Sequence, residues 1–490
     1  MLLQVELLQY GKFVIVSIKW RYLTFLFNYS FVTHDDLFCV IQKLLSERYT
    51  YSVFGFITDV IGNVFFPTID PYHRMLVAFL VFGTAFIATP IGALVMGQLG
   101  DQRGTKLAIE ISMLLLAFSS VGIGCIPLYK DINFVAPLLL VVFRFFQGFA
   151  IGGQFISSMI LFMDSSQNDA VNNRAFQVST VRLASSIGIL SGNLFTYMLR
   201  NVLSEDKLDS WGWRLPFLTG CLTLIPGFFL RYCVQTEDPS DDVLTRTISP
   251  MKYSFRRFNI RPMLCLMGVV SVDSSAFYIC FIWLPSFISK MLKPKIGHSY
   301  GLNAASFFLS QVAFCPIAGR IVDKYNRAII MTIASASLGT LFPLGLFAIQ
   351  KTSSGIWVVV FQTLLGSLRM LLAISYAVYF DDKFHPSIRV TSMSFGFNAS
   401  FAIFGGFSPA LSTALHKVQG IAPAYLVTGT SIFSLLGIWF SMSYKPPRVC
   451  FAPSASTEDL VSLNNNNNQD PSVPSNTSTG LTSPLLTDMP

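Results

Sequence analysis

Five ionisable side chains fall inside long apolar stretches of this sequence, where charges are rare. They are Asp59, Arg144, Arg182, Asp273 and Arg369. On insertion scales an ionisable group at the middle of a membrane costs at least about 2.5–3.5 kcal/mol, so it is expected to face a cavity or a partner. The guanidinium of arginine presents a planar fork of donors that matches a carboxylate. Three intramembrane cations against two anions therefore favour a carboxylate-bearing solute over a cationic one.

The residues beside these charges indicate binding roles. Gln154 shares a helical stripe with Arg144, and Arg182 lies among serines. The expected solute-binding residues are Arg144, Gln154, Arg182, Asp273 and Arg369. Asp59 is the candidate proton-coupling residue. Two structural alternatives stay open: Asp59 could serve in a buried ion pair, and Arg144 could pair with Asp59 or with a backbone carbonyl.

The elements that must position these residues are membrane helices. Of the 490 residues, 52% are hydrophobic and only 12% are charged, whereas a soluble domain carries about 25% charged residues. A membrane-spanning helix needs roughly 20 mostly apolar residues. Stretches of this kind lie at 49–67, 75–98, 107–127, 134–162, 176–199, 214–234, 262–289, 301–322, 328–349, 355–380, 391–415 and 422–443. The sequence therefore predicts an all-α, polytopic membrane protein with twelve transmembrane helices in two six-helix bundles.

The longest interior polar stretch divides these spans six and six. The expected parts are an N-terminal segment at 1–46, a first bundle at 47–234, a cytoplasmic linker at 235–261, a second bundle at 262–444 and a disordered cytoplasmic tail at 445–490. For the N-terminal segment, an interfacial amphipathic helix and an extra spanning helix both stay open. Basic residues gather in the loops on one side, which predicts cytoplasmic termini. A plasma membrane and an internal membrane are both compatible with the sequence.

A short charged motif recurs at the same place in each half. Residues 97–106 read GQLGDQRGTK after the second span, and residues 319–328 read GRIVDKYNRA after the eighth. Arg144 in the fourth span likewise has a counterpart in Arg369 of the tenth. Repeats at matching positions indicate a two-bundle transporter whose site lies between the halves near the membrane midplane.

These motifs resemble the two loop motifs of the major facilitator superfamily. Further stretches resemble its metabolite:proton symporters, the group of proline/betaine, α-ketoglutarate, citrate and shikimate permeases: GNVFFP (62–67), RFFQGFAIGGQ (144–154), WGWRLPF (211–217), WLPSF (283–287), HPSIR (385–389) and FNASFAIFGGFSP (397–409). The resemblance covers roughly residues 47–445. It implies the major facilitator fold and proton symport of an organic acid or zwitterion. It also implies a gate at the loop motifs, formed by Gly97, Asp101, Arg103, Gly104, Asp323 and Arg327.

The sequence departs from this family at two carboxylates. The family usually opens its first span with Glu-Trp-Tyr-Asp-Phe, whereas residues 47–51 read ERYTY, with Thr50 in place of the aspartate. The family's Gly-Gly-Glu in the fourth span ends in Gln154 here. These losses leave proton coupling open, and they favour an uncoupled facilitator as one alternative.

We therefore expect a secondary transporter that moves a small polar organic solute by alternating access, with protons and membrane lipids as further partners. The other alternative is a membrane receptor or scaffold that acts through its tail. The sequence has no phosphate-binding glycine loop of the Gly-Lys-Ser/Thr type, no evident catalytic triad and no CxxC pair, so no enzyme activity, cofactor or metal is expected. Basic loops account for the net charge of +8, so no nucleic-acid partner is expected.

Overall fold

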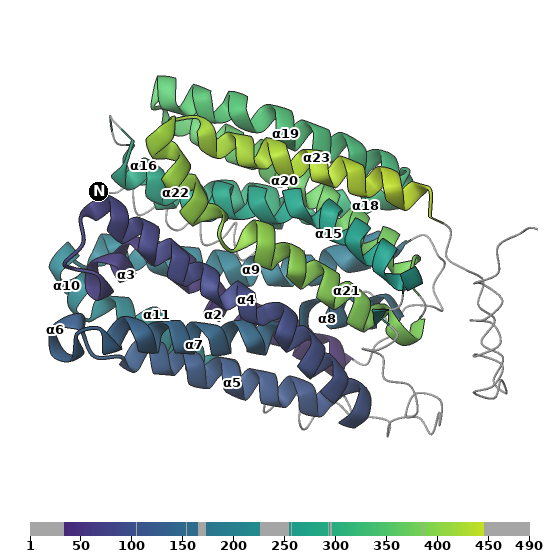
Figure 1. Cartoon of the computed structure of the whole chain (residues 1–490), viewed down its shortest axis with the longest axis horizontal. Coiled ribbons are helices and arrows are strands. Elements are labelled where there is room, and N and C mark those ends of the chain that lie inside the picture. Colours follow the sequence, from purple (N-terminus) through teal and green to yellow (C-terminus); the bar gives the residue numbers. More distant parts are fainter. Residues whose placement is uncertain are drawn as a thin grey trace, which may run out of the picture. The chain divides into compact units, whose positions relative to one another are not determined.

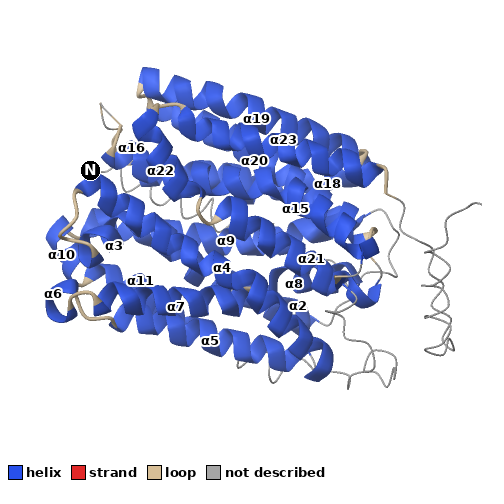
Figure 2. Ribbon diagram, viewed as in Figure 1, coloured by secondary structure: helices blue, strands red, loops and turns tan. Residues whose placement is uncertain are grey.

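The computed structural model describes most of the expected membrane region. The described residues are 34–103, 105–152, 154–164, 173–225, 254–255, 257–292, 294, 296–384 and 386–444. Every regular element within these ranges is helical (Figure 1 and Figure 2). The expected tail and most of the expected linker lie outside the described residues. The all-α prediction is confirmed for the part of the chain that the structure describes.

The first half of the described chain contains the helices of the first five expected spans and the start of the sixth. They are α2 (His34–Phe56) with α3 (Thr58–Phe65), α4 (Pro71–Arg103), α5 (Thr105–Cys125), α7 (Val135–Ile151) with α8 (Gln154–Asp164), α9 (Arg174–Val202), and α11 (Leu215–Leu218) with the 3-10 helix η3 (Thr219–Thr223). The short helices α6 (Tyr129–Ile132), α10 (Glu205–Ser210) and η2 (Gly212–Arg214) lie in the connections.

The second half contains six further spans, and π-helical segments interrupt three of them. They are α15 (Arg257–Tyr278) with η4 (Ile279–Trp283) and α16 (Leu284–Lys290), α17 (Ser299–Phe307) with η5 (Phe308–Ala313) and α18 (Cys315–Lys324), α19 (Arg327–Thr352), α20 (Gly355–Asp381), α21 (Pro386–Ser400) with η6 (Phe401–Gly405) and α22 (Ser408–Val418), and α23 (Ala422–Met442). In Figure 1 most of these helices, such as α19, α20 and α23, lie above those of the first half, whereas α21 lies level with α8 and α9.

Eight helices in the described part of the chain are long and apolar enough to cross a membrane. They are Pro71–Leu99, Leu107–Cys125, Val135–Ile160, Asn259–Lys290, Ser299–Lys324, Arg327–Thr352, Gly355–Asp381 and Ala422–Met442. All eight coincide with expected spans. Large apolar side chains such as Phe118 and Leu344 are 64% and 65% exposed, as expected for a surface that faces lipid.

The first helix begins earlier than the hydropathy pattern predicts. α2 starts at His34, ahead of the expected span at 49–67 and of the expected boundary at residue 47. Lys43 and Glu47 interrupt the apolar pattern, yet they are only 2% and 1% exposed. Their side chains therefore face the protein interior, whereas a hydropathy window treats every charge as if it faced lipid. The expected N-terminal segment at 1–46 therefore overlaps the first helix, because α2 already occupies residues 34–46.

Glycines let α4 and α7 pack backbone to backbone. A Cβ on Gly148 would lie 1.7 Å from the carbonyl oxygen of Ala85, and a Cβ on Gly152 would lie 2.1 Å from that of Thr89. No real side chain tolerates such distances, so both positions require glycine. This is the close helix approach that a Gly-xxx-Gly step permits in membranes. The contact fixes α7, and with it the wall behind the central cavity described below.

Replacing Gly148 is therefore expected to destabilise the first half. Gly148→Ala must push α7 away from the Ala85 carbonyl, and overpacking of this kind costs about 1–3 kcal/mol or more. The matched control is Gly429→Ala on α23, where an added Cβ meets nothing within 4 Å. Thermal unfolding of both variants in detergent, followed by size-exclusion chromatography, checks this. Equal melting temperatures for Gly148→Ala and the wild type would contradict the packing argument.

Candidate functional site

A cavity of about 90 Å³ lies between the two halves. The first half contributes Arg48, Tyr51, Ser52, Phe82, Phe86, Thr89, Ile151, Phe155, Arg182, Ser185, Ser186 and Ile189 to its lining. The second half contributes Phe277, Tyr278, Ile282, Arg369, Met370, Phe397, Asn398 and Phe401. One water needs about 10–15 Å³ of such volume, so the cavity is large enough for several waters or a small solute. It lies where the sequence repeat predicts the site.

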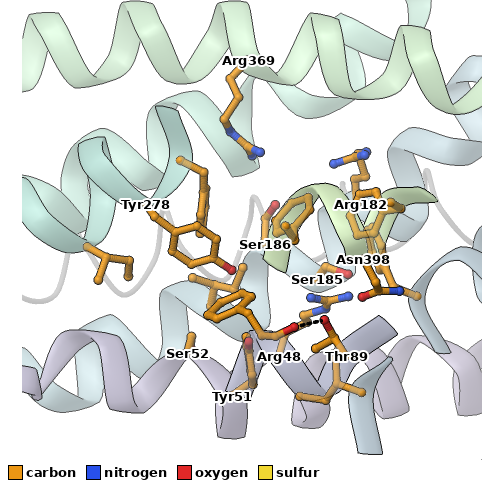
Figure 3. Close-up of a pocket in the computed structure, with 18 of the residues that line it drawn as sticks. Arg48, Tyr51, Ser52, Thr89, Arg182, Ser185, Ser186, Tyr278, Arg369 and Asn398 are labelled. Carbon is orange, nitrogen blue, oxygen red and sulfur yellow. Dashed lines mark hydrogen bonds between the residues drawn. The ribbon is translucent and has the colours of Figure 1, made fainter. Parts of the chain in front are cut away.

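Three guanidinium groups reach this cavity. Arg48 comes from α2, Arg182 from α9 and Arg369 from α20, and Figure 3 shows them approaching from different sides. The Cζ atoms of Arg48 and Arg182 lie 4.2 and 5.5 Å from the centroid of the same ring, Phe155. Among the described residues, no aspartate or glutamate lines the cavity. The formal charge of this lining is therefore entirely positive.

A chain of hydrogen bonds beside the cavity ties the two halves together. Arg182 Nη2 donates to Tyr376 Oη at 2.8 Å, and that hydroxyl donates to Asp273 Oδ2 at 2.7 Å. Asp273 Oδ1 accepts from Arg369 Nη1 at 2.7 Å, and Arg369 Nη2 donates to Gln311 Oε1. The Asp273 side chain is fully buried, and these donors compensate its charge. The structure thus brings together three of the expected site residues, Arg182, Asp273 and Arg369.

The three π-helical segments all meet this site. Ile282 of η4 and Phe401 of η6 line the cavity, and Gln311 of η5 binds Arg369. Single π turns inside α-helices frequently occur at functional sites, because they shift the register of the side chains that follow. Sequence reasoning missed Gln311 and Tyr376, since a buried amide and an aromatic residue in an apolar span have no distinctive pattern. Arg48 had a signal, because it replaces the tryptophan of the family motif.

Arg144 does not reach the cavity, contrary to its expected role in solute binding. Its side chain is fully buried. Nη1 donates to Gln147 Oε1 at 2.9 Å, and Nη2 donates to the carbonyl oxygen of Phe82 at 3.1 Å. Its Cζ also lies 4.3 Å from the ring centroid of Phe54. The backbone-carbonyl alternative is therefore confirmed, and Arg144 joins α7 to α4 behind the cavity wall.

Asp59 also lies away from the cavity, and it pairs with an arginine that the sequence analysis did not single out. Arg200, near the end of α9, donates from Nη1 to Asp59 Oδ2 at 3.1 Å and from Nη2 to Asp59 Oδ1. Arg200 Nη2 also donates to the carbonyl oxygen of Phe56 at 3.2 Å. The ion-pair alternative for Asp59 is confirmed. Arg200 thus occupies both carboxylate oxygens of Asp59, and the proton-coupling role of Asp59 remains a prediction.

The halves meet beside this ion pair, at the end of the molecule that we call the distal end. The Cζ of Arg200 lies 4.1 Å from the ring centroid of Tyr300 in α17, and Tyr72 Oη donates to the carbonyl oxygen of Thr413 at 3.2 Å. In the connection before the sixth span, burial raises the pKa of Asp209, and a hydrogen bond from Asn63 partly opposes this shift. The described contacts that close the distal end thus include a cation–π contact, a neutral hydrogen bond and a 4.0 Å ion pair between Glu205 of the first half and Lys290 of the second.

At the other end, which carries both loop motifs and is called here the motif end, Asp323 crosses between the halves. Its carboxylate oxygens accept from the backbone N–H groups of Ala175 and Phe176 at 2.8 and 2.9 Å. These residues begin α9, and a carboxylate at a helix N-terminus satisfies free N–H groups and interacts favourably with the helix dipole. The contact gives the predicted gating role of Asp323 a structural basis.

An ion cluster adds to the contact between the halves at the motif end. Arg174, the first residue of α9, pairs with Asp381 and Asp382 at the end of α20. Arg389 lies 3.2 Å from Asp381, and Arg327 lies 3.3 Å from Asp382. Arg327, one of the expected gate residues, therefore acts through Asp382 rather than directly on the first half.

The first loop motif is described only in part. A Cβ on Gly97 would lie 4.0 Å from Thr391 Oγ1 of α21, so the second and eleventh spans are neighbours there, as the resemblance implies. The side chains of Asp101, Arg103 and Gln154, and the whole of Gly104, lie outside the described residues. Their predicted roles remain predictions.

Two helical halves that enclose a charged cavity define a membrane transporter. The family model named Major Facilitator Superfamily matches residues 49–409. This chain belongs to the Major Facilitator Superfamily, and it is a secondary transporter of small solutes. The predicted family and the predicted fold, an all-α polytopic membrane protein with the major facilitator fold, are confirmed.

Named relatives support this assignment. The citrate-proton symporter of Klebsiella pneumoniae is 26% identical over 402 residues, which cover 80% of this chain and 87% of that protein. The proline/betaine transporter of Escherichia coli (strain K12) is 26% identical over 427 residues, which cover 84% of each. The solved structure of the proton:xylose symporter XylE bound to 6-bromo-6-deoxy-D-glucose has a TM-score of 0.66 at 14% identity, with 84% of this chain and 95% of that chain covered. This last likeness shows the fold alone.

Weakening the Asp323 contact is expected to open the motif end. Asp323→Asn removes the charge and one acceptor, and loss of a helix cap costs about 1 kcal/mol, which is roughly a fivefold shift in a two-state equilibrium. Cys315 reports this opening, because its Sγ lies 3.1 Å from the carbonyl oxygen of Ser179 across the two halves. Alkylation of Cys315 by N-ethylmaleimide, followed by mass spectrometry, should become several times faster in Asp323→Asn.

The matched control removes a helix-capping side chain whose hydrogen bonds lie within one half. Asn326 caps α19 of its own half, where its side chain accepts from the N–H groups of Ala328 and Ile329. Asn326→Ala should leave the alkylation rate of Cys315 unchanged. An equal increase in both variants would show that general loosening, and not the contact between the halves, controls access to Cys315.

Proposed function

We propose that this transporter is a proton-coupled symporter of a small organic solute that carries a carboxylate. The observation that carries the proposal is the charge of the cavity, where Arg48, Arg182 and Arg369 line the described surface and no carboxylate does. The solutes in the names of the two curated relatives, citrate, proline and betaine, all carry a carboxylate. The name of one of these relatives also states proton coupling.

The three cavity arginines differ in which of their N–H groups are free to donate a hydrogen bond to a solute. Among the described residues Arg48 has no hydrogen-bonding or ion-pairing partner, so its guanidinium is free to bind a carboxylate. Arg182 and Arg369 already bond to Tyr376 and Asp273, but the Nε atom of each is buried without a partner. A carboxylate that accepts from these donors replaces lost hydration with charge-assisted hydrogen bonds.

A solute held in this way contacts both halves at once. Arg48 and Arg182 belong to the first half and Arg369 to the second, so the bound solute draws the halves together. Opening then alternates between the two ends, with the contacts at the motif end broken in one state and those at the distal end broken in the other. By the bias of basic loops, we assign the motif end and both termini to the cytoplasmic side.

Removing Arg48 is expected to weaken binding of the carboxylate specifically. Because Arg48 has no hydrogen-bonding or ion-pairing partner among the described residues, Arg48→Gln leaves none of their buried polar groups unpaired. Loss of a hydrogen bond to a charged group costs about 1.5–3 kcal/mol, which is roughly tenfold or more in affinity. Equilibrium binding of radiolabelled citrate and proline to the purified protein checks this, with prolinamide as the competitor that lacks a carboxylate.

The matched control is Arg261→Gln on α15, because Arg261 is exposed and its only described hydrogen bond is a 3.5 Å contact with the carbonyl oxygen of Phe440. This variant should bind both solutes as the wild type does. Unchanged affinity in Arg48→Gln, or equal binding of proline and prolinamide by the wild type, would contradict the proposed solute class.

Proton coupling is tested separately from solute class. In proteoliposomes, an inward gradient of one pH unit should accumulate the solute about tenfold at one proton per solute, because each pH unit is worth about 1.36 kcal/mol. Uptake that equilibrates without accumulation would instead support the uncoupled facilitator, which the two missing family carboxylates favour.

A further inference from the structure

A buried stripe of polar side chains on α2 leads away from the cavity. Lys43, Glu47 and Tyr51 are spaced four residues apart, so they lie on one face of the helix. Tyr51 lines the cavity, and Glu47 lies one helical turn closer to the start of α2. All three residues are buried, with exposures of 2%, 1% and 6%. From the sequence, Glu47 was visible only as the first residue of the ERYTY motif at 47–51, and no role was assigned to it.

Glu47 differs from the other buried carboxylates near the centre because no group in the described part of the chain donates a hydrogen bond to it. Both oxygens of Glu47 are buried without a hydrogen-bond partner. Both oxygens of Asp273 and both of Asp59 accept hydrogen bonds from neighbouring side chains. Burying an ionised carboxylate without donors is far more costly than burying a neutral acid. The surroundings of Glu47 therefore favour the form that holds a proton.

The charges that act on Glu47 come from its own helix, from Lys43 and Arg48. The elements packed against α2 carry the following described ionisable side chains: Asp59 on α3, Tyr72, His73 and Arg74 on α4, Glu110 and Cys125 on α5, Arg174, Arg182, Tyr197 and Arg200 on α9, and Cys221 on η3. None of them forms a hydrogen bond or an ion pair with Glu47. Lys43 lies one turn away on the same face, and it forms no ion pair within 4.0 Å with any residue that the structure describes.

We propose that Glu47 carries the proton that is coupled to solute transport, an assignment that rests on the proposed function. Its carboxylate forms an O–H bond with a proton taken up from one side of the membrane, and the same bond breaks when the halves open to the other side. No other bond is made or broken, and no further reactant is needed. Lys43 and Arg48 favour the ionised state, and burial favours the neutral one, so the balance can change as the halves move.

Arg48 links this proton to the solute. While Glu47 is neutral, the adjacent guanidinium of Arg48 carries an uncompensated charge at the cavity surface and binds the solute carboxylate. Once Glu47 loses its proton, its negative charge competes with the solute for Arg48. Proton binding and solute binding therefore favour each other, and linkage requires that each strengthens the other by the same factor. Such mutual dependence is what symport needs.

The transport experiment uses Glu47→Gln, which keeps the size of the side chain but cannot release a proton. Accumulation of radiolabelled citrate or proline under an inward gradient of one pH unit should fall from about tenfold to none. Solute exchange across the membrane, with the same solute on both sides and no gradient, should persist at near the wild-type rate. Glu110→Gln on α5 is the matched control, and it should accumulate solute as the wild type does. A Glu47→Gln variant that still accumulates solute would overturn the assignment.

A second readout does not depend on transport, so the two proposals can fail separately. Infrared difference spectra of the purified protein between acid and alkaline pH should contain a separate high-frequency carbonyl stretching band of a protonated carboxylic acid without hydrogen-bond partners, distinct from the band of the other carboxylic acids. Glu47→Gln should remove this band, whereas Asp59→Asn and Glu110→Gln should keep it. A band that survives in Glu47→Gln would overturn the role of Glu47 even if citrate or proline is transported. Its loss would support that role even if the wild type transports neither probe, in which case only the proposed solute class fails.

Discussion

The buried charge of Asp273 is the constraint on which the centre of this protein depends. A carboxylate with no exposure is stable only when donors surround it, and Tyr376 and Arg369 supply them here. The Tyr376 hydroxyl donates its hydrogen bond to Asp273, so its oxygen is left to accept a hydrogen bond from Arg182 of the opposite half. One charge in the second half therefore orients a hydroxyl, and that hydroxyl positions an arginine of the first. Two of the three cavity arginines are placed in this way.

The contacts between the halves at the motif end include a partly exposed ion pair, which is weaker than the buried ion pair at the centre. At the motif end the side chains of Arg174 and Asp382 are 26% and 48% exposed, and exposed ion pairs contribute only about 0–1 kcal/mol each. Breaking a buried pair such as Arg369 with Asp273 costs about 3–5 kcal/mol. An exposed ion pair suits a contact between the halves that must form and break in every cycle. A buried ion pair suits a contact that stays within one half, and Arg369 and Asp273 both belong to the second half.

The sequence predicted the membrane spans and several site residues. It did not predict the roles of those ionisable residues whose role depends on the groups they contact in the folded protein. Apolar length located the spans, and the cost of a charge in lipid singled out Arg182, Asp273 and Arg369. The same reasoning could not tell a cavity arginine from a structural one. Arg144 and Arg369 occupy matching places in the repeat, yet only Arg369 lines the cavity. Asp59 was visible but its partner Arg200 was not, because Arg200 lies 141 residues away in the chain and its pairing depends on how α9 packs against α3.

The supply of donors also explains how this chain tolerates a threonine where its family usually has an aspartate in the first span. Thr50 Oγ1 donates to the carbonyl oxygen of Ser46 at 3.0 Å, so the position is neutral and satisfied within its own helix. Glu47 lies one residue beyond Ser46, buried and without donors. If the coupled proton resides there, the titratable group has moved by about one helical turn along α2. Arg48, where the family usually has a tryptophan, follows this titratable group in the chain and lines the cavity. A chain that lacks this aspartate keeps proton coupling only if another charged group responds both to the solute and to the proton. In the proposed arrangement that group is Arg48, which lines the cavity and follows Glu47 in the chain.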